Sequence, residues 1–324
     1  MPYETSCLDT ITSKSKNRSE KVPIQNQINR RSFLKTVGAG AMAAASVDVL
    51  GTASIAAQPA SSAKTARLYS GCCAYTYRNA FKQGFTLERF IEKAVDLRLD
   101  AVDMTVYYMR STDPGYIENL RWLAYKNAVA FSGAACGVNM VSADPTKRAD
   151  ALVQIKKWID VTDRLGAPHL RIFAGPLPKG SSLPDAVTWV VETMKAAADY
   201  SAGKGIRVGL EDHYGVSQSA GVCLEVMHRV NSPYAGINLD ITHFDPKQGD
   251  PYAQIAACIP YATNTHIRTT FDDGTPIDMD RVWKLFSDAG FKGYMSYEGE
   301  EMDTPGVPPT IAEIERLCKK YSSV

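Results

Sequence analysis

From residue 67 onward, the chain alternates short apolar runs with longer stretches in which apolar residues recur at helical spacing. One such stretch, 87–95, follows Thr86, which predicts a helix with Thr86 as its N-cap. Further helices are predicted to end at Gly166 and Gly290 and to follow Pro309. Between the helical stretches, strands are predicted to begin near eight positions: Leu68, Ala101, Val129, Leu170, Ile206, Gly236, Thr263 and Tyr294.

Eight strand–helix units in a row predict an α/β fold in which the strands run parallel. Across residues 67–324 they match the usual size of one closed (β/α)8 TIM barrel. An open doubly wound sheet is disfavoured, because no G-x-G-x-x-G motif follows any of the strands.

Composition narrows the choice of partners. The 324 residues are 45% hydrophobic and 22% charged, which suits a domain with a sizeable core. Lys and Arg total 36 against 35 for Asp and Glu, so no global field attracts nucleic acid, and we expect no nucleic-acid partner. Seven cysteines without a C-x-x-C pair do not form a disulfide or zinc-finger framework.

The first 66 residues differ from the rest. They are polar up to Asn29 and small and apolar from Thr36 to Ala60, and residues 29–35 (NRRSFLK) resemble the twin-arginine export signal. We therefore predict a disordered leader over 1–66, the twin-arginine machinery as a partner, and a periplasmic or otherwise exported protein. The segment is too short and polar for a stable membrane anchor. The alternative is a mildly apolar linker behind two arginines, which Asp48 favours.

Four polar residues close the last four predicted strands: Glu211, Asp240, His266 and Glu298. They are separated by 29, 26 and 32 residues, about one strand–helix unit each. Side chains of a barrel strand alternate between the helix layer and the interior, and each of these residues has the parity opposite to its apolar neighbours. We therefore expect all four at the carboxyl-terminal mouth of the barrel, where active sites form.

Three carboxylates that converge in a mostly apolar mouth would repel one another and become protonated unless a cation neutralised them. Three oxygen donors and one imidazole suit a single divalent metal ion, with Mn2+, Mg2+ or Co2+ favoured and Zn2+ also compatible. For any one of the four, the alternative is an ordinary helix cap or hydrogen-bonding residue. The repetition on consecutive strands favours the metal.

The segments 209–213 (GLEDH), 238–243 (NLDITH), 265–268 (THIR) and 293–298 (GYMSYE) resemble the xylose isomerase-like barrel superfamily, also described as the sugar phosphate isomerase/epimerase family. The resemblance covers residues 67–324 and is greatest to exported members with a twin-arginine leader. It implies a metal-dependent isomerase or epimerase that transfers a proton through a metal-stabilised enediolate. The implied metal ligands are Glu211, Asp240, His266 and Glu298, with Glu211 and Glu298 also acting as the catalytic acid/base pair.

Three further residues, His243, Arg268 and His213, are expected to bind the substrate. The alternatives are a supporting hydrogen bond for His243 and an ion pair to Asp272 or Asp273 for Arg268. Four other residues could line the pocket: Tyr75, Arg78, His169 and Arg171. For His169 and Arg171, the alternative is that they fill the layers inside the barrel.

The expected substrate is a small unphosphorylated carbohydrate. Acidic residues in the loop 271–278 and at Glu300, Glu301 and Asp303 disfavour a phosphate. A lyase or dehydratase that eliminates an aglycone or water from a keto-glycoside would use the same site, and a non-catalytic sugar-binding barrel is a further alternative. Abasic-site endonucleases of the superfamily use additional histidines on the second and third strands, which this sequence lacks. A homo-oligomer is left open.

Overall fold

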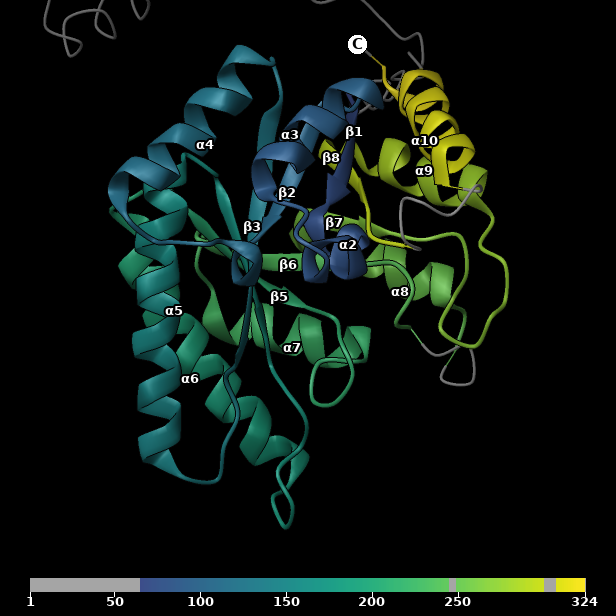
Figure 1. Ribbon diagram of the computed structural model, residues 1–324. Helices are drawn as coiled ribbons and strands as arrows, with labels where there is room; N and C mark the ends of the chain where they lie inside the picture. Colours follow the sequence, from purple (N-terminus) through teal and green to yellow (C-terminus); the bar gives the residue numbers. More distant parts are fainter. Residues whose placement is uncertain (1–64, 245–248, 300–306, 324) are drawn as a thin grey trace, which may run out of the picture. The chain divides into compact units, whose positions relative to one another are not determined.

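The computed structural model describes residues 65–244, 249–299 and 307–323. Eight parallel strands form a closed barrel in which each strand pairs with the next and β8 pairs with β1 (Figure 1). The strands are β1 (Arg67–Cys73), β2 (Ala101–Thr105), β3 (Ala130–Asn139), β4 (His169–Phe173), β5 (Arg207–Glu211), β6 (Ala235–Asp240), β7 (Ala262–Ile267) and β8 (Lys292–Tyr297). The predicted α/β TIM barrel is confirmed, and every predicted strand start lies within two residues of the observed one.

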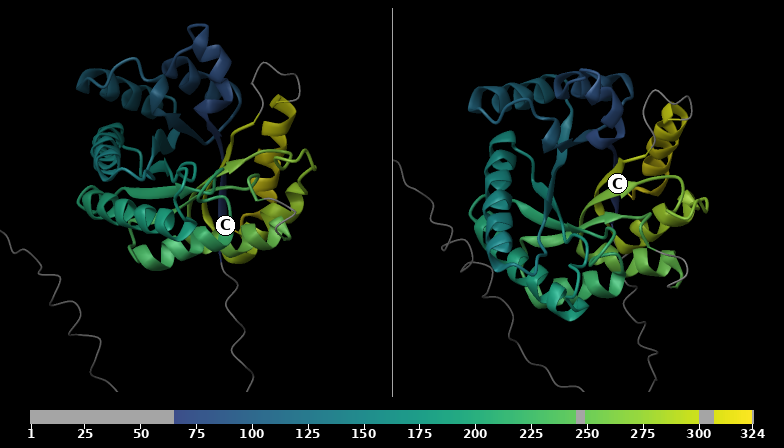
Figure 2. Two further views of the ribbon diagram at one scale, coloured as in Figure 1. Left: turned by 90° about the horizontal axis from the view of Figure 1, so that it is seen from below. Right: turned by 60° about the horizontal axis from the view of Figure 1, so that its bottom comes forward.

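Helices surround the strands, with α5 and α6 on one side and α9 and α10 on the other (Figures 1 and 2). Short 3-10 segments, η1 (Ala74–Tyr77), η2 (Val106–Tyr108) and η4 (Ile259–Tyr261), adjoin three of the strands. No helix in the described part of the chain is long and apolar enough to cross a bilayer. The helices are α2 (Arg78–Lys82), α3 (Leu87–Asp96), α4 (Pro114–Lys126), α5 (Pro145–Leu165), α6 (Leu183–Ala202), α7 (Ala220–Val230), α8 (Pro251–Cys258), α9 (Met279–Ala289) and α10 (Val307–Tyr321).

The predicted helix boundaries follow from local chemistry. The hydroxyl of Thr86 accepts a hydrogen bond from the backbone N–H of Arg89 and so caps α3. Helices α5 and α9 end at Gly166 (φ 82°) and Gly290 (φ 72°), which adopt the left-handed conformation that glycine tolerates best. Helix α10 begins at Val307 rather than behind Pro309, because proline is compatible with the first helical turn.

The apolar core lies between the strands and the helices. Val208 and Leu210 of β5, for example, are fully buried on the helix-facing side. Several polar or charged side chains are buried inside the barrel, among them Asp103, His169, Arg171, Asn238 and Asn264. A network of hydrogen bonds, rather than branched aliphatic layers, therefore supports much of the mouth.

The predicted twin-arginine signal lies outside the described residues, as do Glu300, Glu301 and Asp303. The leader boundary, the export route and the acidity of the post-β8 loop therefore stay predictions.

Candidate metal and acid–base site

The four strand-end residues lie together in the structure. Glu211 ends β5, Asp240 ends β6, His266 is the penultimate residue of β7, and Glu298 follows β8. One donor atom from each lies within 4.8 Å of the donor atoms of the other three, and all four side chains are buried. The pairing of Asp240 with His266 across β6 and β7 brings these two to the same level of the barrel. The expected convergence is confirmed.

His266 lies at the centre of the cluster. Its Nδ1 atom is 2.7 Å from Oε1 of Glu211 and 3.4 Å from Oε2 of Glu298. Burial disfavours a charged ring, but Glu298, Cys73 and Asp103 together outweigh it and raise the pKa of His266 well above its usual range. On the opposite edge of the ring, Nε2 lies 3.5 Å from Oδ2 of Asp103 without a hydrogen bond, and the same Oδ2 accepts a 2.7 Å hydrogen bond from Asn264.

Asp240 uses its two carboxylate oxygens differently. Oδ1 accepts hydrogen bonds from the backbone N–H and the hydroxyl of Thr242, at 3.0 and 2.6 Å. Oδ2 has no hydrogen bond within the described part of the chain, although His243 Nε2 and Arg268 Nη2 lie 3.2 and 3.5 Å away. Burial opposes ionisation, but these two cations outweigh it and hold the pKa of Asp240 well below its usual range.

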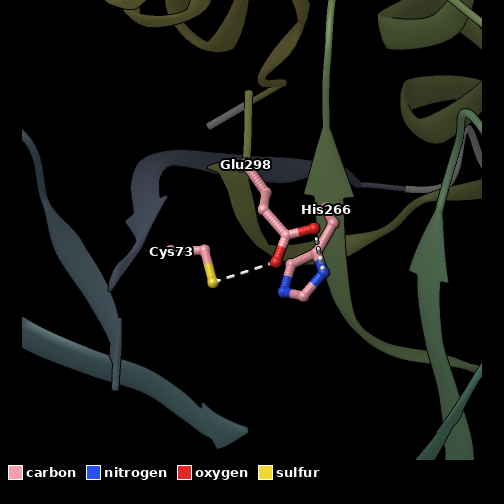
Figure 3. Close-up of side chains that lie close together, drawn as sticks. All are labelled: Cys73, His266 and Glu298. Carbon is pink, nitrogen blue, oxygen red and sulfur yellow. Dashed lines mark hydrogen bonds and ion pairs between the residues drawn. The ribbon is translucent and has the colours of Figure 1, made fainter. Parts of the chain in front are cut away.

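Glu298 contacts Cys73 and His266 (Figure 3), and Arg268 contacts it as well. The thiol of Cys73 donates to Oε1 at 3.3 Å, while Arg268 donates to Oε2 at 3.3 Å and to the backbone oxygen of Glu298 at 2.7 Å. Burial raises the pKa of Cys73 to about 12, so the sulfur remains a proton donor at neutral pH. Burial opposes ionisation of Glu298, but His266 outweighs it and lowers the pKa of Glu298 to about 2.

The four donors fit one divalent cation. Bonds of about 2.0–2.3 Å place the ligands of one ion at most about 4.6 Å apart, close to the spacing observed. Asp240 Oδ2 is a buried acceptor with no hydrogen bond from the described residues, which leaves this oxygen available to coordinate a metal ion. The protein itself offsets part of the carboxylate charge, because Arg171 lies 3.6 Å from Glu211 and adds positive charge to that of Arg268 and His243. Donor geometry, rather than repulsion, supports the metal.

A cavity of about 660 Å³ opens above this cluster. Glu211 and Glu298 reach it, as do all three residues expected to bind substrate, His243, Arg268 and His213. Of the four residues whose role the sequence left open, three line the cavity, whereas His169 is buried inside the barrel. The full lining is Tyr75, Arg78, Tyr107, Arg171, Phe173, Glu211, His213, Tyr214, His243, Arg268, Thr269, Thr270, Tyr297, Glu298 and Gly299.

The alternative contacts of His243 and Arg268 are also present. His243 Nδ1 lies 2.7 Å from Asp272 Oδ2 on the side away from Asp240, and the two carboxylates overcome burial to raise the pKa of His243 to about 11. Arg268 Nη1 lies 3.8 Å from Asp272 Oδ1. His213 is different, because its ring packs against Phe173 and His243 at centroid distances of 4.6 Å, and burial lowers its pKa.

Three residues near the site were not identified from sequence: Asp103, Cys73 and Tyr107. Asp103 carried a usable signal, since it is an acid at an inward position of an otherwise apolar strand. Cys73 and Tyr107 carried none, because their roles depend on how the strand ends are brought together by barrel closure.

The protein is a TIM barrel with a buried cluster of acids and one histidine at its carboxyl-terminal mouth. The family model for the xylose isomerase-like TIM barrel matches residues 91–320, and the chain belongs to that family. A comparison with curated proteins finds no match.

Solved structures with the same fold include a xylose isomerase domain protein from Planctomyces limnophilus, which is 18% identical with a TM-score of 0.61 over 79% of this chain and 99% of that one. D-psicose 3-epimerase with D-tagatose from Clostridium cellulolyticum H10 is 14% identical with a TM-score of 0.62, covering 78% and 96%. D-allulose 3-epimerase from a Methylomonas species in complex with D-allulose is 18% identical with a TM-score of 0.58, covering 80% and 96%. At these identities the likeness is one of fold.

Proposed function

We propose that the chain is a divalent-metal-dependent isomerase or epimerase of an unphosphorylated sugar or sugar derivative. The observation that carries the proposal is that Glu211 and Glu298 share one buried cluster with Asp240 and His266 and also line the cavity above it. Membership of the xylose isomerase-like family supports it. So does the likeness in fold to a D-psicose 3-epimerase and a D-allulose 3-epimerase.

The proposed metal ligands are Glu211, Asp240, His266 and Glu298. A divalent cation held there, with Mn2+, Mg2+ or Co2+ favoured and Zn2+ compatible, would make the C–H bond next to a substrate carbonyl more acidic. The donor set of three carboxylates and one imidazole suits hard or borderline metals.

Proton transfer is assigned to the two glutamates. One carboxylate removes the proton next to the carbonyl, and the other returns a proton to the opposite face or to the neighbouring carbon, which gives an epimer or an isomer respectively. Arg171 lies 3.6 Å from Glu211 and Arg268 lies 3.3 Å from Glu298, so each carboxylate has a cationic neighbour that helps to fix its position. His243, Arg268 and His213 line the same cavity and orient the substrate hydroxyls.

A neutral substrate is favoured over a phosphorylated one. Asp272, which contacts the cavity-lining His243, and the other acids of the loop 271–278 place negative charge next to the cavity, which disfavours a phosphate. The guanidinium groups of Arg171 and Arg268 are engaged by glutamates. The proposed twin-arginine leader agrees with this, because an exported enzyme would meet mainly unphosphorylated sugars.

The test is a panel of neutral ketoses and 3-keto-glycosides incubated in D2O with the metal-loaded protein and analysed by mass spectrometry. Deuterium incorporation with an intact carbon skeleton supports the isomerase or epimerase. Incorporation with release of an aglycone or water would instead establish the lyase. Strong turnover of a sugar phosphate without turnover of its neutral analogue contradicts the proposed substrate class, and absence of exchange across the panel leaves a non-catalytic sugar-binding barrel.

A further inference from the structure

A second hollow of about 340 Å³ adjoins the cavity above the cluster. Phe173, His213 and Tyr214 line both spaces and form the boundary between them. The outer side of the hollow is formed by the end of β3 at Gly137 and by the backbone that follows β4 at Gly175. The two spaces are therefore neighbours that share these three side chains, and Glu211 and Glu298 line the larger one only.

Backbone, rather than side chains, forms much of this hollow. Gly175 (φ 100°) and Gly215 (φ 98°) both adopt a conformation that disfavours other residues. A Cβ atom on Gly215 would lie 2.4 Å from the carbonyl oxygen of Gly175, the same oxygen that accepts a 3.1 Å hydrogen bond from Val216. The backbones of the loops after β4 and β5 are therefore in direct contact, and the hollow lies beside this contact. On β3, a Cβ atom on Gly137 would meet only the ring of Tyr107, at 3.7 Å.

The chemistry of the hollow differs from that of the main cavity. None of the described residues that line it is Asp, Glu, Lys or Arg, whereas the main cavity includes Glu211, Glu298 and three arginines. The aromatic rings of Phe173 and Tyr214 line it, and Tyr214 is 50% exposed. The ring of Tyr107, which is 47% exposed and lines the main cavity, lies next to Gly137 at the edge of the hollow. Exposed aromatic faces next to uncharged backbone favour a neutral ring with an apolar face.

We propose that this hollow binds an uncharged ring attached to the reacting sugar, so that the substrate is a glycoside rather than a free monosaccharide. The inference rests on the proposed function for the position of the reacting sugar at Glu211 and Glu298. A volume near 340 Å³ is at the lower end of ligand sites and suits one ring. A second pyranose and an aromatic aglycone share the required chemistry, namely a flat apolar face without charge.

The test is calorimetric binding of three neutral probes to the full-length protein loaded with Mn2+: methyl β-D-glucopyranoside, phenyl β-D-glucopyranoside and cellobiose. We expect the phenyl glycoside, cellobiose or both to bind about tenfold more tightly than the methyl glycoside, since stacking on an aromatic side chain contributes on this scale. A gain for the phenyl probe alone identifies an aryl ring as the occupant, and a gain for cellobiose alone identifies a sugar ring. Equal affinities for the three probes, or binding of none, overturn the proposal.

Gly137→Leu fills the hollow and should abolish the gain in affinity. Gly115→Leu is the matched control, because a Cβ atom at Gly115 in α4 meets no neighbouring atom. Tyr214→Ala, which removes one of the rings, should reduce the gain as well and provides a second variant if Gly137→Leu fails to fold. A gain that persists in both folded variants contradicts the proposed location.

The proposed isomerase activity and the proposed glycoside subsite can be refuted independently, because the binding affinities are measured without turnover. A protein that prefers the ring-bearing probes but exchanges no deuterium with any sugar would refute the isomerase only. A protein that exchanges deuterium but binds all three probes equally would refute the glycoside subsite only.

Discussion

The Nε2 atom of His266 lies 3.5 Å from Oδ2 of Asp103, on the edge of the ring opposite to the four-residue cluster. Asp103 is fixed in turn by a 2.7 Å hydrogen bond from Asn264, and both side chains are buried. The carboxylate therefore directs Nδ1 of the imidazole toward Glu211 and Glu298. A carboxylate behind a histidine is a common way to fix the orientation of a metal ligand.

Asp103→Asn should weaken Mn2+ binding by about 10–100-fold, because without this carboxylate the imidazole ring of His266 is no longer held in one orientation. Calorimetric titration of Mn2+ into the metal-free protein measures the effect. Asp113→Asn is the control, since the side chain of Asp113 is exposed and makes no capping hydrogen bond to α4. Unchanged Mn2+ affinity in a folded Asp103→Asn variant would show that Asp103 has no such role.

Metal binding should also stabilise the fold. At a free Mn2+ concentration of 100 times the dissociation constant, we expect the free energy of unfolding to rise by about 2.7 kcal/mol, provided that the unfolded chain does not bind the ion. Urea unfolding with Mn2+ and with a chelator measures the difference. Asp240→Asn should remove most of this stabilisation, because Asp240 contributes the buried oxygen that has no other hydrogen bond among the described residues. Equal stabilisation of wild type and variant would place the ion elsewhere.

The thiol of Cys73 should matter for proton transfer through its 3.3 Å contact with Glu298. Cys73→Ala removes a hydrogen bond to a charged carboxylate, and we expect the rate of deuterium exchange to fall about tenfold. Cys73→Ser, which keeps a donor, should restore part of the rate. If alanine and serine have the same effect, the thiol contributes packing rather than positioning of Glu298.

His169 predicts an acid-dependent loss of stability. Burial lowers its pKa to about 4, and both ring nitrogens lack hydrogen bonds from the described residues, so the folded protein keeps this ring neutral while the unfolded chain protonates it near pH 6.5. Because the unfolded state binds more protons, the contribution of His169 is intact above about pH 6.5 and is lost as the pH falls toward 4.

Between pH 7.5 and pH 5, this loss amounts to about 2 kcal/mol. His169→Leu, of similar volume but without a titratable group, should show a correspondingly smaller decrease in unfolding free energy over the same range, measured with urea. An identical decrease in wild type and variant would mean that His169 does not contribute to acid sensitivity.

Much of the fold and the core of the site could be predicted from sequence, because both depend on local periodicity. The parity of Glu211 and Asp240 within their strands was sufficient to place them inside the barrel, and glycine at 166 and 290 marked two helix ends. The same reasoning did not extend to contacts that depend on closure of the barrel. Cys73 meets Glu298 only because β1 pairs with β8, at a sequence separation of 225 residues.

The hydrogen-bond network inside the barrel was not predicted, for a physical reason. Asp103, Asn238 and Asn264 each look like single polar interruptions in apolar strands, and only the pairing of β2, β6 and β7 around one axis brings them into a shared network. The dual contacts of His243 with Asp240 and Asp272 depend likewise on the fold of a loop. Sequence reasoning could state these alternatives but had no means to choose between them.

The proposed mechanism requires one site that both binds a single divalent ion and transfers a proton. The decisive measurement is a titration of the metal-free protein with Mn2+ in D2O, with deuterium incorporation recorded at each step on a substrate identified from the panel. We predict that exchange rises with added Mn2+, reaches a plateau at one ion per chain, and is lost in Glu298→Gln although that variant stays folded. Exchange that is independent of Mn2+, or unchanged in Glu298→Gln, would contradict the proposed mechanism.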